Sequence, residues 1–92
     1  SIRLYEDSET QAGEWYIDVL SVHPNHRRKG IGMKLLQAIE EVAKQQGASV
    51  LALNCDEIND KAYQLYQKIG YTVTSTKILS GHSYYHMTKK LE

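Results

Sequence analysis

The sequence predicts an α/β (α+β) fold with one mixed β-sheet, in which the elements follow in the order β-β-α-β-α-β-β. Two segments carry apolar residues at the spacing of a helix, and five shorter segments carry the apolar patterns of strands. Glycine follows each helical segment, as is common where helices end. No repeat or linker interrupts the 92 residues, so we expect residues 1–92 to form a single domain.

Two strands are predicted near the start of the chain. Residues 1–6 alternate apolar and polar side chains, and residues 14–22 do so again after a polar turn over residues 7–13. One face of the second strand suits burial, with Trp15, Ile17, Val19 and Ser21. The other face suits a wet surface or a cleft, because it carries two carboxylates and a phenol, those of Glu14, Asp18 and Tyr16.

A helix is predicted over residues 31–46, with a buried strand after it. The apolar positions of the helix recur at intervals of three and four residues: Ile31, Leu35, Leu36, Ile39, Val42 and Ala43. Gly47 is placed to cap its C-terminus. Residues 49–53 form a nearly continuous apolar run, of the kind that is buried on both faces of a sheet. We expect the strand–helix–strand unit over residues 15–53 to be a right-handed parallel crossover.

The last third of the chain predicts a second helix and a hairpin. Gly70 ends a helix over residues 60–69, whose apolar stripe is Ala62, Leu65, Tyr66 and Ile69. Residues 71–79 and 83–91 are expected to pair as antiparallel strands around Ser80, Gly81 and His82. Tyrosines gather in this third, where they suit either a cleft or a subunit contact: Tyr63, Tyr66, Tyr71, Tyr84 and Tyr85.

Composition argues against several classes of protein. Lysine plus arginine and aspartate plus glutamate each total 11, and this balance disfavours a general binder of nucleic acid or membrane surfaces. No apolar run approaches the roughly 20 residues of a membrane helix, and the opening residues lack the pattern of a signal peptide. The single cysteine, Cys55, rules out an internal disulfide and fits a reducing compartment. We therefore expect a cytoplasmic protein.

The most informative segment is the basic, glycine-containing loop over residues 26–32, between the second predicted strand and the first predicted helix. The first N–H groups of a helix have no partner within it, and the helix dipole gives that end partial positive charge. Gly30 and Gly32 carry no side chain that would keep a phosphate away from these groups. Positive charge is added at the same point by Arg27, Arg28 and Lys29. The loop therefore predicts a phosphate-binding site.

Residues 27–32, Arg-Arg-Lys-Gly-Ile-Gly, resemble the Q/R-x-x-G-x-G/A signature with which the GNAT superfamily of N-acyltransferases binds the pyrophosphate of acyl-CoA. Residues 59–71 resemble the second signature of that family, N-x-x-A-x-x-L-Y-x-K-x-G-F/Y, and residues 86–91 resemble a common family ending. The two signatures stand in the family's order. The resemblance covers the chain from Tyr16 onward.

The resemblance also implies that part of the family fold lies outside these residues. GNAT domains usually begin with a strand, two helices and another strand, which build much of the acceptor site. Residues 1–92 supply no such helices, so we expect an N-terminally truncated domain that is a fragment or is completed by another chain. A small domain with exposed apolar sheet surface favours association, so a homo-oligomer such as a dimer is also expected.

Acetyl-CoA as co-substrate, without a metal, is the further implication of the resemblance. In the family, two central parallel strands splay apart, and the pantetheine arm lies in the gap and pairs with strand backbone. Here those strands would be residues 16–22 and 50–54. The cofactor-binding residues that the resemblance implies are Leu20, Val22, Arg27, Arg28, Lys29, Gly30, Ile31, Gly32 and Asn59.

The implied chemistry is direct attack of an amine on the thioester. The backbone N–H of Leu20 would polarise the thioester carbonyl, and Tyr66 matches the family's tyrosine that protonates the departing thiolate. The base stays open, because Tyr16 stands where one branch of the family has a glutamate. Three carboxylates remain as alternatives for the base: Glu14, Asp18 and Glu57.

Structural interpretations stand beside these functional ones. Tyr66 lies on an apolar helix stripe, which suits a core aromatic, and Asn59 or Asp60 suits a helix cap. Cys55 suits a small buried residue, and no paired base stands near it in sequence. The four histidines are not spaced as in a zinc site.

The sequence thus predicts an N-acetyltransferase that moves an acetyl group from acetyl-CoA to a primary amine of a small molecule or protein. The alternative is a non-catalytic acyl-CoA-binding module or partner subunit, because the acceptor half of the fold is not part of residues 1–92. An RNA-binding α/β domain is disfavoured by the neutral charge balance. We expect no nucleic-acid or membrane partner.

Overall fold

A computed structural model describes residues 2–6, 14–19 and 29–92 of the protein. The described elements follow the predicted order: β1 (Ile2–Glu6), β2 (Glu14–Val19), α1 (Lys29–Gln45), β3 (Val50–Asp56), α2 (Asp60–Ile69), β4 (Thr72–Leu79) and β5 (His82–Lys90). The largest difference from the predicted bounds is in β3, which continues to Asp56 because β5 pairs with it as far as Tyr84. Residues 20–22, predicted to continue the second strand, lie outside the described residues.

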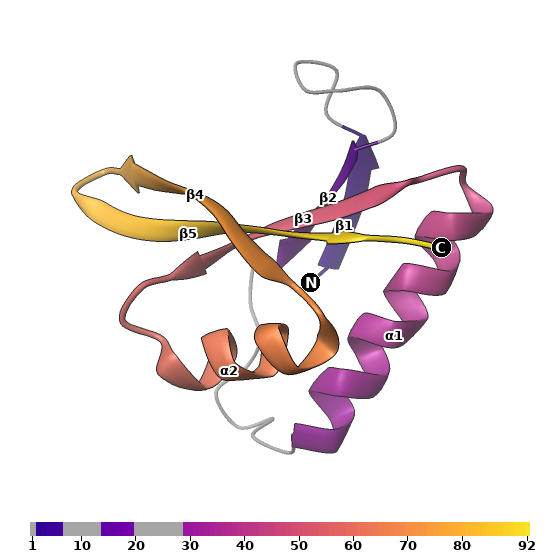
Figure 1. Cartoon of the computed structure of the whole chain (residues 1–92), viewed down its shortest axis with the longest axis horizontal. Helices are drawn as coiled ribbons and strands as arrows, with labels where there is room; N and C mark the ends of the chain where they lie inside the picture. Colours follow the sequence, from indigo (N-terminus) through magenta and orange to yellow (C-terminus); the bar gives the residue numbers. More distant parts are fainter. Residues whose placement is uncertain (1, 7–13, 20–28) are drawn as a thin grey trace.

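The five strands form one mixed sheet in the order β1-β2-β3-β5-β4 (Figure 1). β2 and β3 are parallel, and α1 is the crossover that joins them. The pairs β1–β2, β3–β5 and β4–β5 are antiparallel. This topology confirms the predicted parallel unit and the predicted closing hairpin.

Both helices pack on one face of the sheet, which we call the helix face. The core there contains alternate β3 residues together with residues of α1 and β5: Leu51, Leu53, Cys55, Leu36, Ala43 and Met87. Half-buried side chains of α2 pack against this core, namely Ala62, Leu65, Tyr66 and Ile69. Ala52, between the core residues of β3, is also buried, so this strand is covered on both faces over residues 51–53, as predicted. Neither described helix is long and apolar enough to span a membrane.

Not every apolar residue at helical spacing in α1 is buried. Leu36 is buried, but Leu35 and Val42, which share its helical spacing, are 43% and 49% exposed. Position 40 lies on the buried side instead, four residues after Leu36, and it holds a glutamate that is 8% exposed. Glu40 is tolerated there because Lys89 of β5 pairs with it.

Both helices end at a glycine, as predicted. Gly47 after α1 and Gly70 after α2 have φ of 90° and 115°, a conformation that a residue with a Cβ adopts at a cost. After α2, the N–H of Gly70 donates to the carbonyl of Gln67 at 3.0 Å, and the N–H of Tyr71 donates to that of Tyr66 at 2.9 Å. These two bonds satisfy carbonyls that the helix itself leaves unpaired.

The hairpin turn is shorter than predicted. Leu79 pairs with His82, so only Ser80 and Gly81 form the turn and His82 already belongs to β5. Both turn residues have positive φ, 50° and 78°. This conformation gives the turn a twist that matches the twist of the two strands.

Candidate functional site

The two parallel strands at the centre of the sheet separate toward their C-terminal ends. β2 and β3 are paired from Glu14–Val50 to Tyr16–Ala52, and no pairing between them is found beyond that point in the described strands. β2 nevertheless stays paired with β1 as far as Val19, and β3 stays paired with β5 as far as Asp56. We call this part, lined by residues 17–19 and 53–56, the open end. Unpaired strand edges of this kind can bind an extended chain through their peptide groups.

The N-terminus of α1 lies at the open end. Because α1 joins two parallel strands, it must run back from the end of β2 to the start of β3 (Figure 1). Its first turn, residues 29–32, therefore presents N–H groups without helical partners beside the gap. The same end of the molecule combines a polar helix terminus with a pair of unpaired strand edges.

Gly32 has a packing role that the sequence did not reveal. A Cβ at this position would lie 3.3 Å from Cδ2 of Leu65 in α2, which is tighter than ordinary van der Waals contact. The glycine therefore lets α1 and α2 approach each other closely at the open end. This role is compatible with the predicted one, since a bare backbone also lets a phosphate approach the helix.

The other predicted cofactor-binding residues fall into two groups. Four of them lie outside the described residues: Leu20, Val22, Arg27 and Arg28. Three begin α1, and the structure describes their backbone: Lys29, Gly30 and Ile31. Their contacts with a cofactor stay predictions.

Asn59 caps the N-terminus of α2. Its Oδ1 accepts a hydrogen bond from the backbone N–H of Ala62 at 3.1 Å, so Asn59, and not Asp60, is the capping residue. The amide nitrogen of the same side chain is a separate donor. The cap therefore leaves room for the predicted contact with a bound cofactor.

Tyr66 is half-buried on the core side of α2. Its ring meets the ring of Tyr71 edge-on, with centroids 6.2 Å apart and planes at 65°, an arrangement that aromatic pairs favour. Burial raises the pKa of the Tyr66 phenol, and interaction with Cys55 adds to the increase. The phenol is therefore protonated at neutral pH, which is the form that a proton donor needs.

Cys55 is a buried thiol that neighbours this tyrosine. It is 3% exposed, and its S–H donates to the carbonyl of Asp56 at an S–O distance of 3.6 Å. Burial, with a smaller contribution from Asp56, raises the pKa of the thiol from 9.0 to about 11. The prediction of a small buried residue is confirmed, since a thiol with this pKa is not a thiolate nucleophile at neutral pH.

Comparison with known proteins assigns the family. The sequence model of the "Acetyltransferase (GNAT) family" matches residues 1–71. The chain belongs to the GNAT family. The resemblance drawn from residues 27–32 and 59–71 is thereby confirmed.

Relatives of this GNAT chain include the uncharacterized N-acetyltransferase YdgE of Bacillus subtilis, which is 35% identical over 75 residues, or 82% of the chain and 48% of YdgE. The L-amino acid N-acyltransferase MnaT of Escherichia coli is 35% identical over 54 residues, or 59% of the chain and 31% of MnaT. The chain thus spans about half or less of the length of these two relatives.

Solved acetyltransferases share the fold. One crystal structure of an acetyltransferase is 46% identical, with a TM-score of 0.75 over 98% of the chain and 48% of that protein. YncA of Salmonella typhimurium, solved with its cofactor acetyl-CoA, is 26% identical, with a TM-score of 0.73 over 87% of the chain and 49% of YncA. These structures confirm the mixed α/β architecture predicted from the sequence.

Two side-chain pairs in this GNAT domain escaped the sequence analysis. Nδ1 of His86 lies 3.1 Å from Oδ1 of Asn54, across the β3–β5 pair, and Nζ of Lys89 lies 2.9 Å from Oε1 of Glu40. Alternation along the last strand could have placed His86 and Lys89 on opposite faces. Their partners could not be found without the register between β3 and β5. Within the described ranges, no group of three or more His, Cys, Asp or Glu side chains is placed to hold a metal ion.

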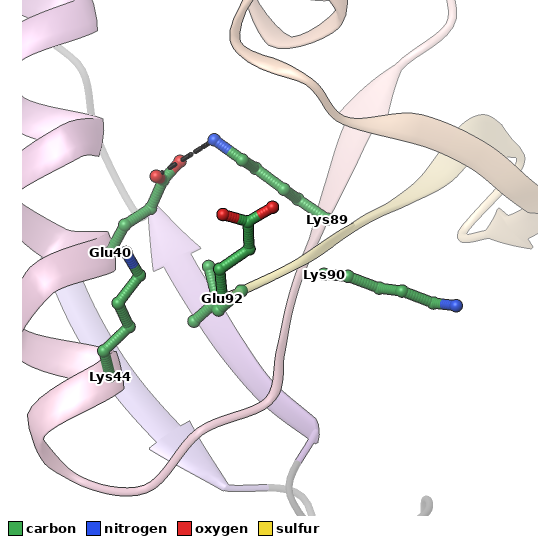
Figure 2. Close-up of a pocket in the computed structure, with 6 residues that line it drawn as sticks. Glu40, Lys44, Lys89, Lys90 and Glu92 are labelled. Carbon is green, nitrogen blue, oxygen red and sulfur yellow. Dashed lines mark hydrogen bonds and ion pairs between the residues drawn. The ribbon is translucent and has the colours of Figure 1, made fainter.

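A hollow of about 300 Å³ lies at the opposite end of the β2–β3 pair, which we call the closed end (Figure 2). It is lined by Glu40, Lys44, Lys89, Lys90, Leu91 and Glu92. They belong to the C-terminal half of α1, to the end of β5, where β3 begins, and to the two residues that follow β5. The hollow is therefore remote from the N-terminus of α1, and the ion pair of Glu40 and Lys89 occupies one side of it.

Proposed function

We propose that this GNAT chain binds acetyl-CoA at its open end and belongs to an N-acetyltransferase that acts on a primary amine. The observation that carries the proposal is the separation of β2 and β3 beside the N-terminus of α1. An acyl-CoA has a pyrophosphate and an extended arm, and this end offers a site for each. YncA with its acetyl-CoA supports the donor, and the name of MnaT supports an amine acceptor.

The pyrophosphate would lie against the first turn of α1. Residues 29–32 present N–H groups there, and Gly30 and Gly32 leave them accessible. Arg27, Arg28 and Lys29 supply positive charge for the two phosphates. An anion at this end also interacts favourably with the helix dipole.

The pantetheine arm would lie in the gap as an added strand. Its amides can pair with the peptide groups of residues 53–56 in β3 and with those of β2. We expect Leu20 and Val22, which follow β2 in the sequence, to offer the same kind of contact. The amide nitrogen of Asn59 would donate to the arm at the start of α2. This arrangement brings the thioester to the separated part of the sheet.

Acetyl transfer would then proceed by direct attack. The amine nitrogen forms a bond to the thioester carbonyl carbon while the backbone N–H of Leu20 stabilises the negative charge on oxygen. The carbon–sulfur bond breaks, and Tyr66 gives its phenolic proton to the CoA thiolate. The proton that the attacking nitrogen loses passes to solvent, and solvent returns a proton to the Tyr66 phenolate. The raised pKa of Tyr66 keeps the donor protonated but makes this transfer uphill, so the thiolate must lie close to the phenol oxygen.

A second function, acyl-CoA binding without catalysis, is favoured by the packing of Tyr66. The ring rests against Tyr71 and the core, as a purely structural aromatic residue would. In this case the open end still binds acyl-CoA, and no acetyl group moves. The two functions therefore share a binding site and differ in turnover.

Titration with acetyl-CoA in a calorimeter tests the proposal. We expect saturable binding near one site per chain, and weaker binding by the Arg28→Glu variant. Lys61→Glu, at an exposed lysine of α2, is the matched charge control and should bind as the parent does. A folded chain that does not bind acetyl-CoA would overturn the proposal. Transfer to a panel of primary amines then separates the enzyme from the binding module.

A further inference from the structure

Tyr71 follows the glycine that ends α2 and lies inside the protein. Its side chain is 1% exposed and is one of the largest fully buried side chains among the described residues. Gly70, with φ of 115°, turns the chain at the end of the helix. This turn brings the N–H of Tyr71 within hydrogen-bond distance of the carbonyl oxygen of Tyr66, five residues earlier. The buried tyrosine therefore packs against the helix that it follows.

Tyr71 contacts Tyr66 in two ways. The hydrogen bond from its N–H to the Tyr66 carbonyl oxygen is 2.9 Å long and holds the backbone of Tyr66. The two rings meet edge-on, with centroids 6.2 Å apart and planes at 65°. Because Tyr71 is buried, its ring has no room to move aside when the Tyr66 ring rotates. The placement of the Tyr66 side chain thus depends on Tyr71.

The ring of Tyr71, and not its hydroxyl, makes this contact. The hydroxyl is buried and has no hydrogen-bond partner among the described residues. A buried hydroxyl without a partner does not stabilise a fold, because it has given up its hydrogen bonds to water. A phenylalanine would keep both the ring and the backbone hydrogen bond. Tyr71→Phe therefore separates the role of the ring from that of the hydroxyl.

Tyr66 also lies close to the open end. Burial raises the pKa of its phenol, and interaction with Cys55, a residue of the open end, adds to the increase. Both residues pack in the same core cluster. Transfer of the phenolic proton to the CoA thiolate is uphill, so it requires a short distance between the two atoms. A small displacement of the reacting groups is enough to lower the rate of such a step.

We propose that Tyr71 is a positioning residue for acetyl transfer, whose buried ring holds the Tyr66 phenol where it can protonate the departing CoA thiolate; this inference rests on the proposed function. Tyr71 acts only through Tyr66 and touches neither acetyl-CoA nor the amine. A merely structural Tyr71 would lower stability when it is changed and would leave the turnover of the folded protein intact. A positioning Tyr71 lowers kcat in a protein that is still folded and still binds acetyl-CoA.

Kinetics of the folded variants test the proposal. Tyr71→Leu, which removes the ring, should lower kcat about tenfold or more and leave the acetyl-CoA affinity unchanged. Tyr71→Phe should keep the parental kcat. Leu51→Ala is the control for lost core packing, because Leu51 is fully buried in the part of β3 that pairs with β2, and its kcat should not change. If Tyr71→Leu does not fold, Tyr71→Met fills more of the space and takes its place.

A parental kcat in folded Tyr71→Leu, or an equal loss of kcat in Leu51→Ala, would overturn the positioning role. Failure of the proposed function looks different, because the parent chain itself then does not bind acetyl-CoA or does not transfer its acetyl group, and the role of Tyr71 falls with it. If only the role of Tyr71 fails, the parent and Tyr71→Leu are equally active.

NMR of tyrosines labelled at Cζ follows the phenol itself. The Tyr66 signal is identified by its loss in Tyr66→Phe. Saturating acetyl-CoA should shift this signal in the parent and in Tyr71→Phe, and the shift should be smaller in Tyr71→Leu at equal occupancy. The same shift in all three proteins would contradict the proposal, since the phenol would then reach the bound thioester without the Tyr71 ring.

Discussion

The two ends of the β2–β3 pair are built differently. At the closed end the strands are paired, α1 ends in a glycine cap, and Lys89 joins β5 to Glu40 of α1 with Nζ–O distances of 2.9 and 3.0 Å. At the open end the strands part and α1 begins. At the closed end Lys89 pairs with Glu40, whereas at the open end the described residues of β2 and β3 do not pair with each other and the first N–H groups of α1 have no partner within the helix.

The residues that we expect to stabilise the fold therefore lie at the closed end of the strand pair, and those that we expect to bind acetyl-CoA lie at the open end. A paired end with a partly buried ion pair holds α1 against the sheet. An end that leaves peptide groups unpaired gives up hydrogen bonds, and binding sites commonly occupy such places. Changes at the closed end should therefore alter unfolding, and changes at the open end should alter acetyl-CoA binding or transfer.

The largest expected effect is at the open end, in Tyr66→Phe. We expect kcat for acetyl transfer to fall about 100-fold, because the thiolate loses its proton donor, while acetyl-CoA affinity stays the same. The phenylalanine keeps the edge-on contact with Tyr71. Tyr63→Phe on the same helix is the control, and its kcat should not change. Equal losses of binding and turnover would make Tyr66 a structural residue.

Lys89→Met tests the closed end. The free energy of unfolding, measured by urea denaturation, should fall by about 2 kcal/mol because Glu40 loses its partner. Breaking a fully buried ion pair would lower it further, but 24% of the Lys89 side chain is exposed. The double variant Glu40→Leu with Lys89→Met should recover most of the loss. Acetyl-CoA affinity of the folded protein should not change. A large loss of affinity would show that the two ends are coupled.

A pair of glycine variants compares the ends directly. Gly47→Ala should lower the free energy of unfolding by about 1 kcal/mol, because φ of 90° strains a residue with a Cβ, and it should leave acetyl-CoA affinity unchanged. Gly32→Ala should weaken acetyl-CoA about tenfold, or 1.4 kcal/mol, with little change in unfolding. Its gain in helix propensity offsets the close contact with Leu65. The reverse pattern of the two variants would contradict the division between the ends.

The last expected effect, absent at neutral pH, is an alkaline loss of stability. The folded protein raises the pKa of Cys55 from 9.0 to about 11, so above pH 9 the unfolded chain releases this proton first. The contribution of the Cys55 thiol to the free energy of unfolding is fully present below pH 9 and is lost as the pH rises toward 11. Melting temperatures measured across this interval should fall, and Cys55→Ala should reduce the slope. An unchanged slope would place the alkaline loss on the tyrosines, whose pKa is also raised at Tyr66.

The fold could be predicted because its local signals agree. Glycines at 47 and 70 follow clear helical stripes, and the strand patterns lie between them. Helical spacing alone did not identify which apolar residues of α1 are buried, since Leu35 and Val42 are exposed. The core instead accepts Glu40, because a lysine 49 residues away pairs with it. No local pattern contains that information.

The candidate site also has parts that could be predicted from the sequence and parts that could not. Its helix-terminal parts, from Lys29 to Gly32 and Asn59, could be found because they fall in short motifs. The contact between Asn54 and His86 could not be found in this way, since these two residues meet only through the register of β3 against β5. The hairpin turn, for which the sequence predicted three residues and the structure has two, sets only the register of β4 against β5. A one-residue error there moves every side chain of a strand to the other face.

Amide hydrogen exchange with and without acetyl-CoA tests the central claim most directly. If the open end binds the cofactor, acetyl-CoA should slow exchange at the start of α1 and at residues 17–19 and 53–56. Exchange at the closed end, around Lys44, Val50 and Lys90, should stay the same. Slower exchange around the closed-end hollow, with no change at residues 53–56, would contradict the account.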